Sequence, residues 1–456
     1  MLITPWIRPL KHITRGVHRL KFNELLLIWL GLVAAALPAT MYFVTDEVAH
    51  RRLFYVLGTA PILLFIFSRP SYWRELASSS VFLSFTLLIG VVIVSGVTTP
   101  DIVIDDRYNA VRYPLLGFTF MFAIVVISLH FPRFPWILIG VVTIGGAMHS
   151  AYVIADILIG HGVDGLRHRL WFDEGYESSP NRIATFYGPL AVFGIGLAFG
   201  ARSRWTCLAW LLAAALCTAI VLLTQSRSGI LGVVLALLAL ALLEGRWRIV
   251  AAITAAAAGF LALVELGGLY TDSFFDRYRA AAVFIRFDLW SATLERIQDA
   301  FWTGGGWMMD TRIHLEERGL IHSHPHNLFL ETHLRAGIAG TVALLAFLAA
   351  VCVGIWKSRG TQPLGRIGAA ALLVWFTHGF FNSRLYMGGI GSEFVYLYVP
   401  VALLISAQLY ALANKRSGAV KKARESAHTV VQSGQSGSDR RPPSIVQRGR
   451  DRQVSA

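Results

Sequence analysis

The chain contains 456 residues, of which 55% are apolar and only 15% are charged. Soluble globular domains carry about 25% charged residues, so this composition excludes a water-soluble enzyme and a disordered chain and leaves a polytopic membrane protein. The formal net charge is +14. We attribute this excess to membrane topology and to attraction to anionic membrane lipid, and we expect no nucleic-acid binding.

Apolar runs follow one another along the whole chain, and a transmembrane helix needs about 20 apolar residues. The runs predict an all-α fold with about 12 transmembrane helices. They cover residues 25–44, 53–68, 79–98, 113–129, 135–158, 183–200, 205–224, 229–244, 249–266, 333–356, 366–381 and 394–413.

The basic residues indicate the orientation of these spans. Lys and Arg gather before the first run, in the short loops on that side, and after the last run. The positive-inside rule makes this side cytoplasmic, so both termini are expected there. Residues 414–456 are rich in Ser, Gln, Gly and Arg, which predicts a disordered basic tail.

The longest segment outside the runs lies on the opposite side of the membrane. We expect nine spans with short loops over residues 1–266, a large outer loop over residues 267–332, three more spans over residues 333–413, and the tail beyond them. Binding and catalytic residues concentrate on loops. The outer face is therefore the expected place of a functional site.

Helical periodicity marks part of the outer loop. The apolar residues near Arg286 recur at close to a helical period, which predicts an amphipathic helix at the membrane surface. They are Phe284, Phe287, Leu289, Trp290, Leu294 and Ile297. Three glycines, 304–306, follow. They fit either a helix stop or a close approach of the backbone to a ligand, and we favour the stop.

Histidines are concentrated in the sequence IHSHPHNLFLE, where His322, His324 and His326 alternate. Imidazole is a common zinc ligand, but neither a carboxylate nor a cysteine completes an obvious site, and we expect no metal. Plain surface histidines are a second interpretation. We favour general acid or base chemistry, because imidazole titrates near neutral pH.

Arginines lie at the outer ends of several spans. Arg182, Arg227 and Arg384 have this position, and Arg286 lies in the outer loop on the same side. Each by itself fits a side chain that snorkels to the lipid headgroups. Together they predict a site for an anion such as a lipid diphosphate, because guanidinium grips phosphate oxygens with two parallel hydrogen bonds.

These motifs resemble the O-antigen ligase and polymerase superfamily. The resemblance lies between about residues 170 and 340 and otherwise depends on the span count. Its elements are PNR at 180–182, SRSG at 226–229, the R-x-x-x-W pattern at 286–290 with the glycine-rich DAFWTGGGW, and PHNLFLE at 325–331.

The resemblance implies a GT-C-like glycosyltransferase of the bacterial inner membrane, with its active site in the periplasm and no cofactor. It would take a glycan from undecaprenyl diphosphate and attach it to lipid A-core. His326 would be the general base, with His324 as the alternative. Three arginines would bind the diphosphate: Arg182, Arg227 and Arg286. The implied supporting residues are Asn181, Ser226, Asn327, Glu331 and Arg384.

Three other functions remain open from the sequence, one of which is transfer of the glycan onto protein. An O-antigen polymerase would use the same donor but a second lipid-linked glycan as acceptor. A flippase for lipid-linked glycans would use the arginines to line a pathway. Transport predicts ionisable residues deep within spans, whereas Asp156, Glu265 and His378 are each isolated or close to an end.

Overall fold

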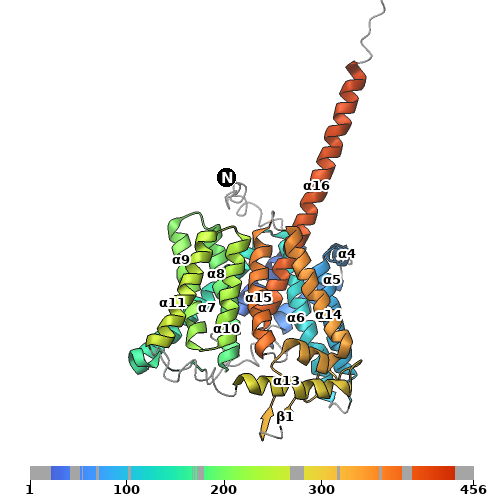
Figure 1. The fold of residues 1–456 in the computed structure, drawn as a ribbon. Coiled ribbons are helices and arrows are strands. Elements are labelled where there is room, and N and C mark those ends of the chain that lie inside the picture. The colour runs from blue at the N-terminus through green and yellow to red at the C-terminus, as the bar shows by residue number, and fades with distance from the viewer. Residues whose placement is uncertain are drawn as a thin grey trace, which may run out of the picture. The chain divides into compact units, whose positions relative to one another are not determined.

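The computed structural model describes the helical framework and most of the outer segment. It covers residues 22–41, 52–53, 55–67, 71–100, 104–166, 168, 170–171, 179–267, 282–315, 319–358, 362–382 and 393–436. Within these ranges the chain is almost entirely helical (Figure 1). The predicted all-α polytopic membrane fold is confirmed.

The first part of the described chain consists of helices that precede the outer segment. They are α1 (Phe22–Thr40), η3 (Tyr55–Thr59), α3 (Ala60–Phe67), α4 (Ser71–Leu76), α5 (Ser80–Val97), α6 (Ile104–His130), α7 (Phe134–Gly165), α8 (Pro180–Gly200), α9 (Arg204–Leu223), α10 (Arg227–Leu243) and α11 (Trp247–Gly267).

The remaining elements are α13 (Ala282–Gln298), β1 (Ile313–Leu315), β2 (Leu320–His322), α14 (Leu328–Ser358), α15 (Pro363–Asn382), η5 (Phe394–Tyr398) and α16 (Val399–Ser436). The chain forms two compact units, Met1–Leu409 and Tyr410–Ala456, and every feature of the site lies in the first.

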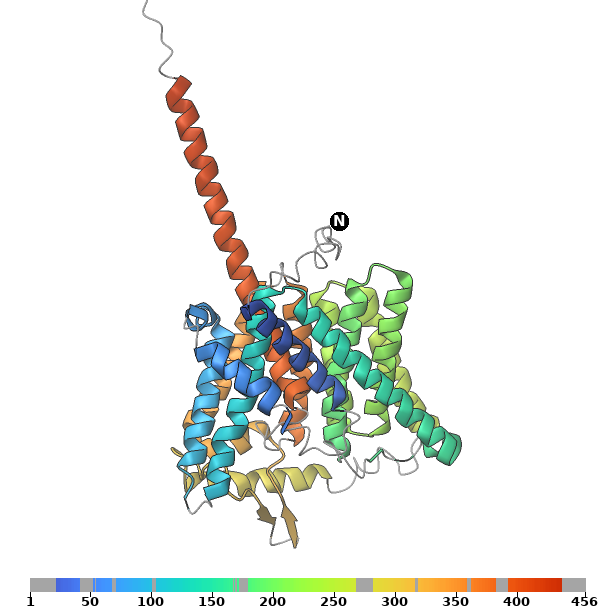
Figure 2. The same cartoon turned by 180° about the vertical axis from the view of Figure 1, so that it is seen from behind.

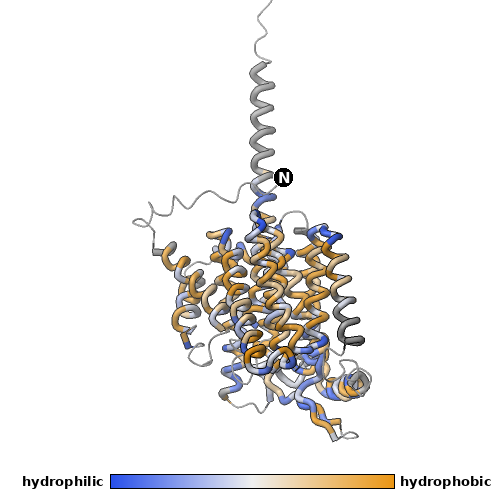
Figure 3. Tube along the Cα trace, turned by 90° about the vertical axis from the view of Figure 1, so that its left-hand side faces the viewer, coloured by the Kyte–Doolittle hydropathy of each residue, from blue (hydrophilic) through white to orange (hydrophobic). Residues whose placement is uncertain are grey.

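Among the described residues, eight helices are long and apolar enough to cross a membrane, and four shorter apolar helices accompany them. Each of the twelve runs predicted from the sequence falls on one of these helices. Figure 3 shows hydrophobic residues along the helices of the bundle and hydrophilic ones mainly near their ends. This distribution is the one that a hydrocarbon layer around the bundle requires.

Small residues allow the helices to approach one another closely. A Cβ on Gly194 of α8 would lie 2.9 Å from the Cβ of Ala214 in α9. On the far side, where Figure 2 shows α1 beside α7, a Cβ on Gly145 would lie 2.7 Å from the Ala39 carbonyl oxygen. Glycine and alanine at such positions let backbones pack without lipid between them.

α13 lies across one end of the bundle, and the hairpin β1–β2 lies at the same end (Figure 1). α13 is the amphipathic helix predicted from the sequence, although the side chain of Phe284 is outside the described residues. Leu289 and Ile297 are buried, whereas Phe287 and Leu294 are more than half exposed. The buried pair packs in a small cluster of its own with Ile313, Leu315 and Leu334.

The outer segment also contains a short hairpin, which the predicted all-α fold did not include. β1 and β2 pair antiparallel, with Ile313 opposite His322. Each strand has only three residues, too few to show an alternating pattern in the sequence.

The tail also differs from the expectation. Composition predicts disorder over residues 414–456, whereas α16 continues to Ser436. Residues 437–456 lie outside the described part. The Ala, Lys, Arg, Glu and Gln residues of this segment are good helix formers, which accounts for the longer helix.

Candidate functional site

Three helices that hold predicted site residues begin with a side-chain cap. Ser179 accepts a hydrogen bond from the Arg182 N–H at the start of α8 (3.4 Å), and Ser226 accepts one from the Gly229 N–H at the start of α10 (3.4 Å). Asn327 caps α14 by accepting from the N–H groups of the second and third helical residues, at 3.0 and 3.1 Å. These caps explain why the helices begin at the predicted motifs.

Side-chain hydrogen bonds bring these helix starts together with the end of α15. The Ser226 hydroxyl donates to Oδ1 of Asn181 (2.9 Å), and the Asn181 amide donates to Oδ1 of Asn382 (3.5 Å). The Asn382 amide donates to Oγ of Ser228 (2.5 Å). The PNR and SRSG motifs, 45 residues apart, therefore meet at one place. Helix N-termini carry partial positive charge, so this end of the bundle suits an anion.

The histidine loop joins the same place through His326. Burial lowers the pKa of His326 to about 4, with further lowering by the charges of Arg286 and His322, and a hydrogen bond with Asn382 acts in the opposite direction. The ring is therefore neutral at physiological pH and has a lone pair with which it can accept a proton. Its Nδ1 is covered from solvent and has no hydrogen-bond partner in the part of the chain that is described.

Two contacts fix the backbone of this loop. The indole N–H of Trp290 in α13 donates to the Pro325 carbonyl oxygen (3.1 Å). The backbone N–H of His326 donates to Nδ1 of His324 (3.3 Å). His326 itself has φ of 53°, in the left-handed region. This contact occupies Nδ1 of His324, which leaves His326 as the better candidate for the base.

The rings of the three histidines lie close together. The ring centroids of His324 and His326 are 4.0 Å apart, and those of His322 and His326 are 5.9 Å apart. His322 ends strand β2, whereas His326 has positive φ. Over the ranges described, no group of three or more His, Cys, Asp or Glu side chains has a metal-binding arrangement.

The arginines that are predicted to bind the diphosphate have different surroundings. Arg286 is half-buried in α13, and its guanidinium lies 5.9 Å from the ring centre of Phe381 at the end of α15. Arg227 is half-buried as the first residue of α10, and Arg182 is exposed in the first turn of α8. Arg384 lies outside the described residues. The charge of Arg286 acts on His326. Arg182 and Arg227 directly follow Asn181 and Ser226, two residues of the hydrogen-bonded chain.

Glu331, which the resemblance implies as a supporting residue, is paired with an arginine of its own helix. It forms a buried ion pair with Arg335 one turn later in α14, with Nε and Oε1 3.1 Å apart. Arg335 also donates to the Trp307 carbonyl oxygen and to Oγ1 of Thr311 (3.2 Å). The carbonyl oxygen of Arg335 accepts from Ser95 of α5 (2.8 Å).

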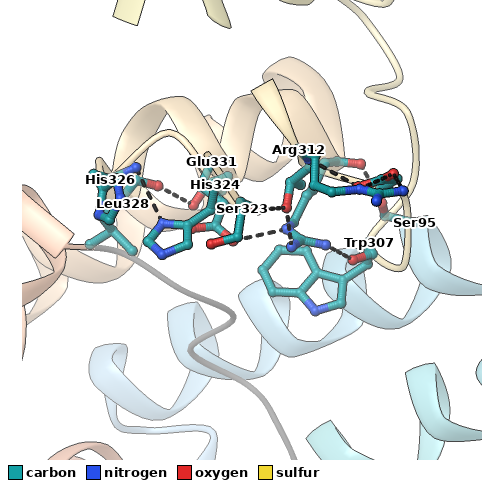
Figure 4. A network of polar contacts seen from close by, with 12 residues as sticks. Ser95, Trp307, Arg312, Ser323, His324, His326, Leu328 and Glu331 are labelled. Atoms are coloured by element: carbon teal, nitrogen blue, oxygen red, sulfur yellow. Dashed lines mark hydrogen bonds and ion pairs between the residues drawn. The ribbon is translucent and has the colours of Figure 1, made fainter. Parts of the chain in front are cut away.

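Figure 4 shows these contacts running from His326 and His324, past Glu331, to Trp307 and Ser95. The ion pair therefore fixes the first turns of α14, directly after the histidine loop, to the outer segment and to α5. The side-chain hydrogen bond of Glu331 is with Arg335 and not with an arginine predicted to bind the diphosphate. Glu331 therefore supports the site from a distance.

The three glycines 304–306 serve a backbone contact. α13 ends at Gln298, before the glycines, and the loop then meets α14. The N–H of Gly305 donates to the Leu334 carbonyl oxygen (2.9 Å) and that of Gly306 to the Arg335 carbonyl oxygen (2.8 Å). A Cβ on Gly304 would lie 2.5 Å from the Arg335 backbone. The close approach is to a helix and not to a ligand.

Asn382 and Ser228 belong to this cluster and were not singled out in the sequence, and His378 was considered only as an isolated ionisable residue in a span. Oγ of Ser228 lies 3.3 Å from Nδ1 of His378, and Ser228 and His378 are both buried. A signal existed, because Asn382 directly precedes the segment with Arg384, and Ser228 lies within the SRSG motif. Small polar residues at the ends of spans carry no further pattern that would single them out.

Comparisons with known proteins agree with the resemblance seen in the sequence. A family model described as O-antigen ligase matches residues 212–345. The chain is also 25% identical over 378 residues to a curated protein of Pseudomonas aeruginosa described as "O-antigen ligase", which covers 82% of this chain and 88% of that protein. The segment that the family model matches, residues 212–345, includes the SRSG motif, α13 and the histidine loop. These are three of the four elements on which the resemblance depends.

Proposed function

We propose, from the O-antigen ligase family domain that the chain carries over residues 212–345, that it is a lipid-linked oligosaccharide glycosyltransferase. It transfers an O-antigen glycan from undecaprenyl diphosphate to lipid A-core at the periplasmic face of the bacterial inner membrane. The observation that carries this proposal is the hydrogen-bonded meeting of the PNR and SRSG motifs with Asn382 at the end of α15.

The proposed reaction is a direct displacement. The acceptor hydroxyl attacks the anomeric carbon of the donor glycan while the bond from that carbon to the diphosphate oxygen breaks. His326 accepts the proton of the hydroxyl, and the electron pair of the broken bond remains on the diphosphate. One displacement inverts the anomeric centre, so no enzyme nucleophile is needed. The negative charge that develops on the leaving group would be stabilised by Arg182, Arg227 and Arg286.

The environment of His326 supports this role. A base that is neutral at physiological pH and covered from water favours the acceptor hydroxyl over hydrolysis. The helix starts of α8 and α10 add their partial positive charge to that of the arginines on the same side. Aromatic side chains in the outer segment, such as Trp290 and the exposed Trp302, are available to contact sugar rings.

Purified full-length protein in lipid nanodiscs tests the proposal. We expect transfer when lipid-linked glycan and lipid A-core are both present, with the acceptor lipid shifted to higher mass. Longer lipid-linked glycans from the donor alone would instead indicate a polymerase. Movement of the donor across the bilayer without bond transfer would indicate a flippase. Either result would overturn the ligase function.

His326→Ala is expected to bind donor but to transfer at less than about one hundredth of the wild-type rate, the usual contribution of a general base. His324→Ala is the matched variant, and it is expected to retain more activity because its Nδ1 serves a backbone contact. Near-normal turnover of His326→Ala would remove it as the base. Donor binding and thermal unfolding distinguish lost chemistry from lost fold.

A further inference from the structure

Three tyrosine rings surround Arg112 near the start of α6. Cζ of its guanidinium lies 4.7 Å from the ring centre of Tyr113, 5.0 Å from that of Tyr108 and 5.8 Å from that of Tyr55. All three distances are within the range of about 6 Å over which the face of an aromatic ring attracts a cation. We call Arg112 and these three rings the tyrosine cage. The proposed glycosyl transfer uses none of them.

Two elements build the tyrosine cage, and a third holds it. Tyr108 lies one turn before Arg112 in α6, and Tyr55 is the first residue of η3. η3 is a π-helix, a rare conformation that is frequent at functional sites. The indole N–H of Trp29 in α1 donates to the Leu57 carbonyl oxygen of η3 (3.1 Å). This contact attaches η3, and with it the ring beside α6, to a neighbouring helix.

The tyrosine cage lies at the end of the bundle that carries the outer segment. A Cβ on Gly96, at the end of α5, would lie 2.5 Å from Cβ of Ala110 in α6 and 3.6 Å from Cβ of Trp307 in the outer segment. α1, η3 and α6 hold neither His326 nor any arginine predicted to bind the diphosphate. The cage is therefore a separate place on the same side of the membrane.

Apolar side chains beside the cage face outward, as they do where a protein contacts lipid. Val56, next to Tyr55, is 68% exposed, and Leu115, three residues after Arg112, is 43% exposed. The span of α6 has 25 residues from Asp106 onward, which is about 37 Å of helix against a hydrocarbon layer of about 30 Å. Arg112 lies about 9 Å from the end of this span, near the boundary between hydrocarbon and headgroups.

The positive charge of Arg112 has no counter-charge in the part of the chain that is described. Its Nε is covered from solvent and has no hydrogen-bond partner there, and the ion pairs found there do not include it. Two other arginines with little exposure are paired, Arg335 with Glu331 and Arg366 with Glu244. An arginine within a span normally has a partner, and the tyrosine rings are neutral.

We propose that the tyrosine cage binds the phosphate group of a membrane lipid in the leaflet on this side of the bilayer. The rings hold the guanidinium group in place, and phosphate oxygens can accept two parallel hydrogen bonds from such a group. The exposed apolar side chains around the cage contact the acyl chains of the same lipid. This inference needs no glycosyl transfer and goes beyond the proposed function.

Native mass spectrometry of the full-length protein in detergent measures lipid binding directly. The probes are phosphatidylglycerol, bisphosphorylated lipid A, and diacylglycerol, which has acyl chains but no phosphate. We expect Arg112→Gln to weaken the binding of a phosphate-containing probe by roughly 10-fold or more, the usual effect of losing a hydrogen bond to a charged group. Binding of diacylglycerol should not change.

Arg107→Gln is the matched control. Arg107 is exposed near the start of the same helix, as expected of a side chain that extends to the headgroups. Its substitution removes one positive charge from this end of α6 and leaves the cage intact. We expect it to change lipid binding by less than about twofold, because an exposed charge contributes little.

The two phosphate-containing probes distinguish the source of the phosphate. A loss of binding in Arg112→Gln that is confined to lipid A would identify the lipid part of the acceptor as the occupant. A loss for phosphatidylglycerol, alone or together with lipid A, would identify an ordinary anionic lipid. Both results support a phosphate site at Arg112.

Wild-type affinity of Arg112→Gln for both phosphate-containing lipids would overturn the inference. An equal loss in Arg107→Gln would also overturn it, because the effect would then be one of net charge alone. If thermal unfolding shows that Arg112→Gln does not fold, Arg112→Lys decides by the same criteria, since it keeps the charge but not the two parallel hydrogen bonds. The assay measures binding without turnover, so a failure of the proposed glycosyl transfer would leave this inference standing.

Discussion

His326 differs from its neighbouring histidines in both its backbone and its ring. Its φ of 53° is uncommon for a residue with a Cβ and costs about 1–2 kcal/mol. The contact of Trp290 with Pro325 and the cap formed by Asn327 hold the loop in this conformation. Strained backbone of this kind clusters at functional sites, and Gln225, which precedes the cap of α10, has a similar φ of 51°.

The pH dependence follows from the surroundings of His326. Its pKa is lowered to about 4, and the ring must be neutral to act as a base. We expect kcat/KM, which reports the free enzyme, to be constant near neutral pH and to fall only as the pH drops through about 4. A bound diphosphate would offset the charge of Arg286 and raise this pKa, so the acid limb of kcat should lie at higher pH.

Steady-state rates with varied donor between pH 3.5 and 8, a range set by that pKa of about 4, check this expectation. An acid limb of kcat/KM near the ordinary histidine value of about 6.5 would show that the ring titrates in water. The base would then not be the buried His326 of this structure.

A substitution of Arg227 tests whether diphosphate binding depends on the planar shape of the guanidinium group. It is half-buried at the start of α10, beside Ser226. We expect Arg227→Lys to lose roughly 10- to 100-fold in kcat/KM, because an ammonium group cannot form two parallel hydrogen bonds to phosphate. Hydrogen bonds to charged groups contribute about 1.5–3 kcal/mol, which corresponds to this range.

Arg366→Lys is the control for the Arg227 variant. Arg366 pairs with Glu244 (2.7 Å) at the end of α15 that is remote from Asn382. It should turn over at the wild-type rate. A fully active Arg227→Lys would instead identify Arg227 as a side chain that extends to the lipid headgroups.

At the scale of the element, the outer segment is fastened to α14 at a bend in that helix. Gly337 has φ of 58° inside α14, so the helix is two helices end to end. The glycine-rich loop 304–306 donates its N–H groups to carbonyl oxygens just before this bend. α13, the hairpin and the histidine loop are thus held to a span by backbone contacts that require glycine.

Gly304→Ala and Gly319→Ala separate this contact from backbone strain. Both glycines have positive φ, 69° and 61°, but a Cβ on Gly304 would meet the Arg335 backbone at 2.5 Å, whereas one on Gly319 would meet nothing within 4 Å. Gly319→Ala should cost about 1–2 kcal/mol and remain active. Gly304→Ala should lower the unfolding temperature further and reduce transfer.

Thermal unfolding and transfer assays on the two glycine variants provide the measurement. Equal effects of the two substitutions would mean that the loop does not need its contact with α14. Both substitutions have the same cost of placing alanine at positive φ. The larger effect expected for Gly304→Ala therefore comes from the clash of its Cβ with the Arg335 backbone.

The sequence predicted the spans well and the outer segment less well, for physical reasons. A long apolar run has few alternatives to a membrane helix, so each of the twelve runs falls on an apolar helix. The helix around Leu289 was predicted because its period is visible over 17 residues. The hairpin was missed, since three-residue strands show no period, and the bend at Gly337 depends on a contact with a distant loop.

The same reasoning applies to the site. Motifs with unusual composition, such as the histidine run, could be selected by chemistry alone. Asn382 and Ser228 could not, because their role depends on a contact between residues 154 positions apart. Glu331 was selected, but its partner Arg335 was not recognised, since two charges one turn apart on a helix are more often a solvent-exposed pair.

At the scale of the whole molecule, the proposed chemistry needs no divalent cation. The arginines and helix starts would supply the positive charge that a metal provides in other transferases. We expect turnover to be unchanged after treatment with a chelator. Loss of activity that zinc or magnesium restores would contradict this, and metal analysis of the purified protein would show which ion is bound.

The contacts of Arg335 have a consequence for how the protein is made. Ser95 of α5 must find its partner 240 residues later in the chain, and Ser79 of the same helix must find Gln408, which is 329 residues away. Spans leave the ribosome in order, so α5 waits in the bilayer until α14 and the start of α16 are synthesised. A nascent chain that stalls before the histidine loop and α14 has neither His326 nor Asn382 in place, and such an unfinished copy would leave the cell's supply of activated glycan untouched.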